Sequence, residues 1–468
     1  MLHPRTIVRR VLLTWLCLVS AQTARAQLAS TDADALAAVV SAELRDTKTP
    51  GAALALVKGE RIVWTKGYGV SSVETGAPVT PDMLFRLGST TKMFTAAAVV
   101  AMVERGALQL DRPIGDVVAG LHPAIAALTL ERLLTHTAGM RDEAPMFGRH
   151  DDDALLAQAR AMDAGWAFTG PGAIYSYSNP GFWLAGVAAQ EAAGRPYADV
   201  LADLLFKPVG MSHTTVRPTL AMTYPLAQGH DVEKGAPTIV RPAADNSASW
   251  PAGSIFSSVL DLSRWAIAFM NRGSIDGSPA ISPTLIETLA TPRVPIPGST
   301  AQYGLGLDVD RHHDLRRLSH DGSRAGYGSR IVMLPDRQIA VIALANRTGS
   351  SMPKSVQRAV ELLLDAAPEA APSPAPVTAP TDAEARHLVG RYQQSPSDGV
   401  DLVVAGTSLQ LRVAGQPPRD VVARGNGRYS ARGEAGVDAI DFVIVEGRDG
   451  ATYLHRGGRS FKRVSAGR

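Results

Sequence analysis

Cysteine is nearly missing from this sequence, and the single cysteine, Cys17, lies close to the N-terminus. Disulfide frameworks and thiol nucleophiles both need cysteine, so the rest of the chain must fold and act without either. Leu16 stands directly before Cys17, where a lipoprotein signal usually has a small residue. Lipid attachment at Cys17 is therefore disfavoured as well.

Long hydrophobic runs are missing too. The apolar segment 11–19 is too short to cross a bilayer, and no later stretch reaches about 18 consecutive apolar residues. Arg9 and Arg10 precede this segment and the small-residue sequence 24–26 follows it, which is the layout of a secretory signal peptide over residues 1–26. We therefore expect export to the bacterial periplasm or the extracellular space, by the Sec or twin-arginine route, and no membrane span in the mature chain.

An excess of positive charge is also lacking. The net charge of +3 includes four arginines within residues 1–26, which contain no acidic residue, so the mature chain carries +3 − 4 = −1. Nucleic-acid binders concentrate positive charge, and this balance argues against a nucleic-acid partner. With 45% hydrophobic residues, the chain is long enough to bury a large core and to carry an additional domain.

The first stretch that indicates chemistry is Ser89-x-x-Lys92, which opens the apolar, helix-forming segment 93–103. Residues three apart on a helix share one face, so the Ser89 hydroxyl and the Lys92 amine can meet as nucleophile and base. The helix N-terminus adds unpaired N–H groups for an oxyanion. A simple capping role for Ser89 is the alternative, and a second Ser-x-x-Lys at 351–354 shows how freely the pattern recurs. A phosphate-binding loop is excluded, because the required Gly and Ser or Thr beside Lys92 are absent.

Two further polar groups stand close together later in the chain. Tyr177 and Asn179 are two residues apart and follow the turn sequence 170–172. Tyr177 is a candidate proton carrier if a nearby ammonium lowers the pKa of its phenol from about 10, and Asn179 is a candidate donor to a substrate amide. The alternative is a turn whose aromatic rings simply pack.

A third candidate group is His320-Asp321-Gly322-Ser323, which precedes a strand-like alternating segment. Glycine at 322 would let a substrate backbone approach closely. A second His-x-Gly with the same form begins at His455.

No histidine has the spacing of a metal site. His136 and the pair His312-His313 lack accompanying ligands at suitable separations. We interpret these histidines as core or surface residues, and we expect neither a metal nor a cofactor.

The order of the expected elements indicates an α+β domain. Expected helices cover residues 27–47, 93–106 and 356–364, and expected strands cover 52–57, 62–68, 331–334 and 339–345. Short helices and loops dominate the middle of the chain. Strands at both ends around a helical middle predict an antiparallel β-sheet flanked by helices, with a mostly helical subdomain.

A change of composition marks the domain boundary. After the signal peptide, residues 27–365 form the first predicted domain, and residues 366–382 are rich in Ala and Pro, as in an extended linker. Residues 383–468 alternate short strand-like runs with turns, which predicts a small all-β, barrel-like domain. All three candidate groups precede the linker, so we expect the first domain to fold without the barrel and the barrel to alter its substrate range.

Together, the Ser-x-x-Lys, Tyr-x-Asn and His-x-Gly groups resemble those of one family, the serine β-lactamases of class C with the related penicillin-binding D-peptidases and esterases. They occur in that family's order and at similar separations, whereas the second copies at 351 and 455 do not. Further matches are Leu133-Leu134-Thr135-His136-Thr137-Ala138-Gly139, Phe206-Lys207-Pro208-Val209-Gly210-Met211, Ala252-Gly253-Ser254 and Tyr303-Gly304-Leu305-Gly306. The resemblance covers about residues 30–365, and the C-terminal domain is similar to domains appended to some members.

The resemblance implies a β-lactamase/transpeptidase-like fold and an acyl-enzyme mechanism without a cofactor. In that mechanism Ser89 attacks a carbonyl, and Lys92 takes the proton directly or through Tyr177. Backbone N–H groups of Ser89 and Ser323 would bind the oxyanion, and Asn179 would orient the substrate. We expect an exported serine hydrolase of D-amino-acid peptides, amides, esters and also β-lactams. The alternatives are a true class C-like β-lactamase or D-Ala-D-Ala carboxypeptidase, and a non-catalytic sensor of β-lactams or cell-wall peptides.

Asp321 departs from the family pattern, which has a small or hydroxyl residue after the Lys or His that helps to hold a substrate carboxylate. His320, Asp321 and Gly322 would line the substrate, and the Asp321 charge would repel a carboxylate, whereas a largely neutral His320 would offset little. We therefore predict that β-lactams are hydrolysed more slowly than esters or D-amino-acid amides that lack a carboxylate. Pairing of Arg324 with Asp321 would remove this repulsion. Asp321 could instead attract a substrate amine.

Overall fold

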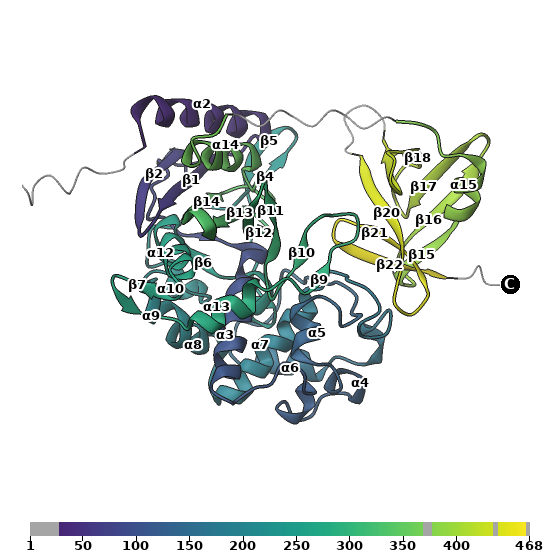
Figure 1. Ribbon diagram of the computed structural model, residues 1–468, viewed down its shortest axis with the longest axis horizontal. Coiled ribbons are helices and arrows are strands. Elements are labelled where there is room, and N and C mark those ends of the chain that lie inside the picture. Colours follow the sequence, from purple (N-terminus) through teal and green to yellow (C-terminus); the bar gives the residue numbers. More distant parts are fainter. Residues whose placement is uncertain (1–27, 368–376, 434–438, 465–468) are drawn as a thin grey trace, which may run out of the picture.

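The computed structural model describes residues 28–367, 377–433 and 439–464. The predicted signal peptide, residues 1–26, and the central part of the predicted linker lie outside these ranges. Figure 1 shows a large mixed α/β domain joined to a separate β-barrel.

An eight-stranded antiparallel sheet forms the centre of the first domain, in the order β2-β1-β14-β13-β12-β11-β10-β9. Its strands are β1 (Gly51–Lys58), β2 (Arg61–Gly69), β9 (Val294–Pro295), β10 (Gln302–Tyr303), β11 (Asp308–His312), β12 (Leu315–Arg324), β13 (Tyr327–Leu334) and β14 (Ile339–Ala345). Strand β1 pairs with β14, with Ala52 opposite Ala345. The predicted sheet of early and late strands is therefore confirmed.

Both faces of the sheet are buried here, which explains why β14 is apolar throughout and β1 is apolar up to its exposed last residue, Lys58. In β1, Leu54 and Leu56 face one core together with helices α2 (Ser30–Thr47) and α14 (Pro353–Leu363). Ala53 and Ala55 alternate with them and face a larger core. This larger core includes α3 (Thr91–Glu104) and α12 (Val259–Met270). The alternation follows from the two-residue period of a strand.

Helix α3 is apolar on nearly all sides and lies in the middle of this larger core, as such a helix must. It packs against α7 (Asn179–Ala193) and α13 (Pro283–Ala290).

The remaining α-helices described in this domain are α4 (Pro123–Ala126), α5 (Leu130–Leu134), α6 (Ala154–Arg160), α8 (Tyr197–Leu201), α9 (Lys207–Val209), α10 (Pro218–Ala221) and α11 (Trp250–Gly253). Two-stranded sheets join β3 (Phe85–Arg86) to β6 (Phe256–Ser257), β4 (His230–Glu233) to β5 (Ala236–Ile239), and β7 (Ser274–Ile275) to β8 (Ser278–Pro279). Within the described ranges, no helix has the length and apolar character that spanning a membrane requires.

The predicted C-terminal barrel is confirmed, and a short helix, α15 (Asp382–Leu388), precedes it. The strands are β15 (Gly390–Ser395), β16 (Asp398–Ala405), β17 (Ser408–Val413), β18 (Arg419–Ala423), β19 (Arg428–Arg432), β20 (Ile440–Glu446), β21 (Thr452–Arg456) and β22 (Arg459–Val464). Strand β22 pairs back onto β15 and closes the barrel.

The barrel is bonded to the loop that carries Tyr177. The Tyr177 N–H donates to the carbonyl of Gly458 (2.8 Å). The Ser460 hydroxyl donates to the carbonyl of Tyr175 (2.8 Å), and the Ser460 N–H donates to Ser176 Oγ (3.1 Å). Three consecutive residues of the loop are thus held by the β21–β22 hairpin. Folding of the first domain without the barrel stays a prediction, but that domain alone would lose these bonds.

Candidate active site

Ser89 lies in a short helical turn, Gly88–Thr90, that leads into α3. It is partly exposed and borders a cavity of about 730 Å³. Gly88 has a φ of +52°, and a Cβ there would lie 2.6 Å from the backbone nitrogen of Ser323 on β12. Only glycine fits this position, because the backbone is left-handed and tightly packed. This packing holds the start of α3 against the end of β12.

Lys92 is fully buried, directly behind Ser89. Its Nζ lies 3.2 Å from Ser89 Oγ and 2.7 Å from each of two carbonyl oxygens, Asn179 Oδ1 and the backbone carbonyl of Ala252. Burial holds the pKa of Lys92 well below its usual value, and the charges of Arg459 and Arg324 lower it further, against an opposing effect of Asp142. The amine is therefore poised to be neutral.

Tyr177 completes a triangle with these two residues. It lines the same cavity as Ser89, and Lys92 Nζ lies 4.7 Å from the centre of its ring. The condition that a nearby ammonium lowers the pKa of Tyr177 is not met: burial raises this pKa far above 10, and the Ser89 hydroxyl offsets only part of the rise. Tyr177 stays protonated, so it can donate a proton but is a poor base.

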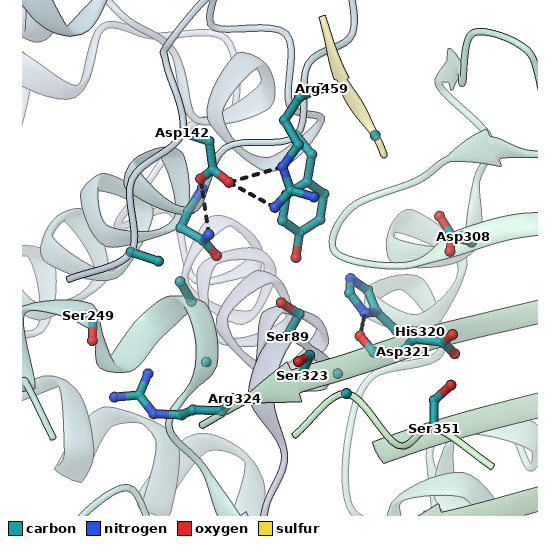
Figure 2. Close-up of a pocket in the computed structure, with 18 of the residues that line it drawn as sticks. Ser89, Asp142, Ser249, Asp308, His320, Asp321, Ser323, Arg324, Ser351 and Arg459 are labelled. Carbon is teal, nitrogen blue, oxygen red and sulfur yellow. Dashed lines mark hydrogen bonds and ion pairs between the residues drawn. The ribbon is translucent and has the colours of Figure 1, made fainter. Parts of the chain in front are cut away.

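Asn179 is held by two residues that the sequence patterns did not reveal. Asp142 Oδ1 accepts from the Asn179 side-chain amide (3.0 Å) and from its backbone N–H (2.8 Å). Asp142 Oδ2 accepts two bonds from Arg459 of the barrel, at 3.1 and 2.8 Å. Figure 2 shows Arg459 and Asp142 joined above the Ser89 side chain. A continuous chain of bonds thus runs from the barrel through Asp142 and Asn179 to Lys92.

Replacing Arg459 by glutamine is expected to lower kcat about tenfold or more, because a partly buried charge-assisted pair that orients Asn179 is lost. The change also removes a charge that lowers the pKa of Lys92 and leaves Asp142 unpaired, which raises it. If Lys92 acts as the base, the acidic limb of the pH–rate profile should move to higher pH. Asp142→Asn should move it to lower pH.

Arg448→Gln, at an exposed arginine of the same barrel, is the matched control and should leave the pH profile in place. Equal profiles for Arg459→Gln and the control would contradict the connection to Lys92.

The His320 group lies on β12, across the cavity from Asn179. His320 is buried, its Nε2 lies 3.1 Å from the Tyr303 hydroxyl, and burial lowers its pKa to about 3, so it is neutral as expected. Gly322 is sterically required, because a Cβ there would lie 1.8 Å from the carbonyl oxygen of Leu87. Ser323 follows on the cavity wall.

Asp321 is paired, and its partner is Arg330 rather than Arg324. The Nε and Nη2 of Arg330 donate to the two carboxylate oxygens of Asp321 at 2.6 and 2.8 Å. The premise that an uncompensated Asp321 charge repels a substrate carboxylate is therefore wrong. Asp321→Thr would break this pair and leave Arg330 as an unpaired cation, so faster hydrolysis of carboxylate-bearing substrates by this variant would reflect Arg330 rather than the loss of a repelling charge.

Asp308 is another cavity residue that sequence patterns missed. Burial, with the nearby charges of Asp321 and Asp310, raises its pKa from 3.8 to about 7. A raised carboxyl pKa favours the protonated folded state, so stability is lost as pH rises from about 4 to 7. Asp308→Asn should raise the unfolding free energy at pH 8 by roughly 1 to 4 kcal/mol and change it little at pH 4. Urea titrations at the two pH values would show this, and equal shifts at both would contradict it.

The second Ser-x-x-Lys sequence, at 351–354, and the second His-x-Gly sequence, at 455–457, do not form a catalytic arrangement. Ser351 borders the cavity, but Lys354 points to Asp46 (3.4 Å) on the surface. His455 lies inside the interface between barrel and loop, where its Nδ1 is 2.8 Å from Ser460 Oγ. His136 is buried against the ring of Tyr177, with a centroid distance of 4.2 Å, in agreement with the prediction of a core histidine. Across the described ranges, no group of three or more His, Cys, Asp or Glu residues is arranged to hold a metal ion.

A serine and a lysine at the start of a central helix, facing a tyrosine loop and a strand of an antiparallel sheet, are the features of the β-lactamase/transpeptidase fold. Comparison with known proteins agrees, since a family model for beta-lactamases matches residues 36–366. The chain belongs to this family, whose members are generally serine hydrolases.

The chain is 29% identical over 337 residues to the unguisins hydrolase ungD of Aspergillus violaceofuscus (strain CBS 115571), covering 65% of this chain and 59% of that protein. It is 29% identical over 316 residues to penicillin-binding protein 4 of Amycolatopsis lactamdurans, covering 64% of this chain and 81% of that protein. The crystal structure of SurE superposes with a TM-score of 0.74 at 26% identity, covering 93% of this chain and 99% of SurE. The chain spans about three fifths of the length of the unguisins hydrolases that it matches.

Proposed function

We propose that this chain is an exported serine hydrolase that cleaves amide or ester bonds through an acyl-enzyme on Ser89. The observation that carries the proposal is the set of bonds around Lys92 Nζ. Two carbonyl oxygens lie 2.7 Å from it and accept its protons, and Ser89 Oγ lies 3.2 Å from it. A neutral amine has two N–H groups and one lone pair. Two N–H groups satisfy the two carbonyls, and the lone pair is left for the Ser89 proton.

The proposed reaction begins when the Ser89 proton moves to Lys92 as Oγ bonds to the substrate carbonyl carbon. The oxyanion accepts bonds from the N–H groups of Ser89 and Ser323. Tyr177, which is protonated and lines the same cavity as Ser89, gives its proton to the leaving group and recovers one from the Lys92 ammonium. Water then attacks the acyl-enzyme, releases the acid product and restores Ser89.

The substrate class is proposed to be D-amino-acid peptides, their amides and esters. SurE has been crystallised with D-Leu, and ungD is named as a hydrolase of unguisins. Pairing of Asp321 with Arg330 leaves β-lactams and D-Ala-D-Ala ends as further candidates, because no uncompensated Asp321 charge excludes their carboxylate.

A substrate panel tests this proposal. D-amino-acid amides, short acyl esters, an N-acyl-D-Ala-D-Ala peptide and a chromogenic cephalosporin would be compared with the L-enantiomers where these exist. We expect turnover of at least the esters and the D-amides. Saturable binding of these compounds without turnover of any would instead favour the non-catalytic sensor.

A further inference from the structure

Arg324 is a charged side chain whose buried donors have no hydrogen-bond partner among the described residues. It ends strand β12, directly after Ser323, and borders the active-site cavity. Its Nε and Nη2 atoms are both buried, and no described residue accepts a hydrogen bond from either. Orphaned buried donors are rare in folded proteins and destabilise them, most of all on a charged group. Unsatisfied buried donors on a charged group therefore indicate a functional role or a bound ligand.

The nearest carboxylate is already occupied. Asp245 Oδ1 accepts from Arg86 Nη2 (2.8 Å) and from Trp250 Nε1 (3.3 Å), and Asp245 Oδ2 lies 2.9 Å from His150 Nδ1. Arg86 is itself only 3% exposed. Burial and Arg86 lower the pKa of Arg324 to about 9, so Arg324 is still charged at neutral pH. Asp245 therefore pairs with Arg86 and not with Arg324.

The other cavity arginines are neutralised. Three arginines line the cavity: Arg324, Arg330 and Arg459. Arg330 and Arg459 each form a two-bond pair with a cavity carboxylate. Only Arg324, of these three, offers N–H groups to a ligand.

Arg324 also has a defined place relative to the nucleophile. Figure 2 shows its side chain extending to the Ser249 side of Ser89, whereas Asp308 and Asp321 lie on the other side. The neighbouring Ala325 borders both this cavity and a second one of about 450 Å³, which Arg86 also lines. A ligand group that reaches Arg324 therefore meets its guanidinium, and a second arginine, Arg86, lines the adjoining cavity.

We propose that Arg324 receives a carboxylate carried by the substrate, so that the enzyme selects substrates with an acidic group at this end of the cavity. The guanidinium presents parallel N–H groups that match the two oxygens of a carboxylate. The proposal rests on the proposed function, because the bound carboxylate belongs to a molecule whose carbonyl lies at Ser89.

Two matched substrate pairs test the selection. In the first, an N-acetylated D-dipeptide ester carries D-Glu or D-Gln before the residue whose carbonyl is attacked. In the second, the leaving D-alanine has a free carboxylate or an amide. In one of these pairs, we expect kcat/KM to be at least about tenfold higher for the acidic member. A tenfold ratio corresponds to the free energy that one charge-assisted hydrogen bond contributes.

Variants of Arg324 show whether this residue is responsible. Arg324→Met keeps the length of the side chain but removes the donors, and it should bring the two members of that pair to equal kcat/KM. Arg324→Glu should favour a substrate with D-Lys in place of the acidic group. Arg448→Met, at an exposed arginine of the barrel, is the control and should keep the native preference. Equal rates within both pairs for the native enzyme, or a preference that survives Arg324→Met, would overturn the proposal.

A binding measurement separates this proposal from the proposed function. In Ser89→Ala, which leaves Arg324 in place, calorimetry would compare N-acetyl-D-glutamate with N-acetyl-D-glutamine. We expect about tenfold tighter binding of the glutamate, lost in Ser89→Ala/Arg324→Met. Equal affinities would overturn the anion site even if the native enzyme is an active hydrolase, whereas tighter glutamate binding would support the site even if no substrate is turned over.

Discussion

Replacing Ser89 by alanine is expected to lower kcat/KM by about ten-thousand-fold or more while leaving the fold intact. The change removes one oxygen, and with it the atom proposed to form the covalent bond, so the residual rate must come from binding and the oxyanion site alone. Ser89 is partly exposed at the cavity, so little packing is lost. The measurement is steady-state hydrolysis of an ester and a D-amide, with the melting temperature recorded for both proteins.

The control for Ser89→Ala is Ser351→Ala, which removes a second serine from the same cavity wall. This serine has no lysine beside it, because Lys354 lies on the surface near Asp46. Near-native rates for Ser351→Ala and a collapse for Ser89→Ala would assign the nucleophile. Ester hydrolysis that survives in Ser89→Ala with unchanged kcat would refute the assignment.

Lys92→Ala and Tyr177→Phe are each expected to lower kcat about a thousandfold, and their combination is expected to cost little more than the larger single effect. In the proposed reaction, Lys92 takes the Ser89 proton and Tyr177 passes one to the leaving group, so both residues serve one proton path. Groups that act as a unit show strongly non-additive effects. The measurement is a double-mutant cycle on one ester substrate.

Lys92→Ala also leaves two carbonyl acceptors without their donor, so unfolding experiments must accompany the kinetics. Tyr177→Phe provides the cleaner variant, because it removes a hydroxyl and keeps the packed ring. If the two losses multiplied fully in the double variant, the residues would act in separate steps and the shared path would be wrong.

The sequence predicted the parts of the molecule that local patterns determine. Alternating and continuous apolar runs located β1, β2, β13 and β14, and the apolar stretch after Lys92 located α3. The glycine at 322 was predicted to let a substrate backbone approach closely, but the backbone that lies against it is that of Leu87 in the protein itself. These features depend on periodicity and on the special backbone of glycine, which a single sequence displays directly.

The features that sequence reasoning missed depend on residues that meet only in the folded chain. Arg459 lies more than 300 positions from Asp142, and no pattern in the barrel marks it as a partner. Asp142 itself follows the recognised segment around His136 by only a few residues, and that position was the one available signal. Arg330 rather than Arg324 pairs with Asp321 because the two lie opposite each other across β12 and β13, whereas Arg324 lies beyond, at the end of the strand.

The condition placed on Tyr177, a pKa lowered by a nearby ammonium, fails for a related reason. A nearby lysine lowers a phenol pKa only if the lysine is charged, and burial disfavours charge on both groups. The sequence showed that the two residues could meet but not that both would be buried. The lowered pKa of Lys92 and the raised pKa of Tyr177 are both consequences of burial around α3.

The covalent intermediate can be measured directly. The native protein would be mixed with a slowly deacylating β-lactam or a fluorophosphonate, and the labelled peptide would be identified by mass spectrometry after digestion. We predict a single adduct on Ser89, absent from Ser89→Ala and strongly slowed in Lys92→Ala. Labelling at another residue, or none while substrates are still hydrolysed, would contradict the acyl-enzyme on Ser89.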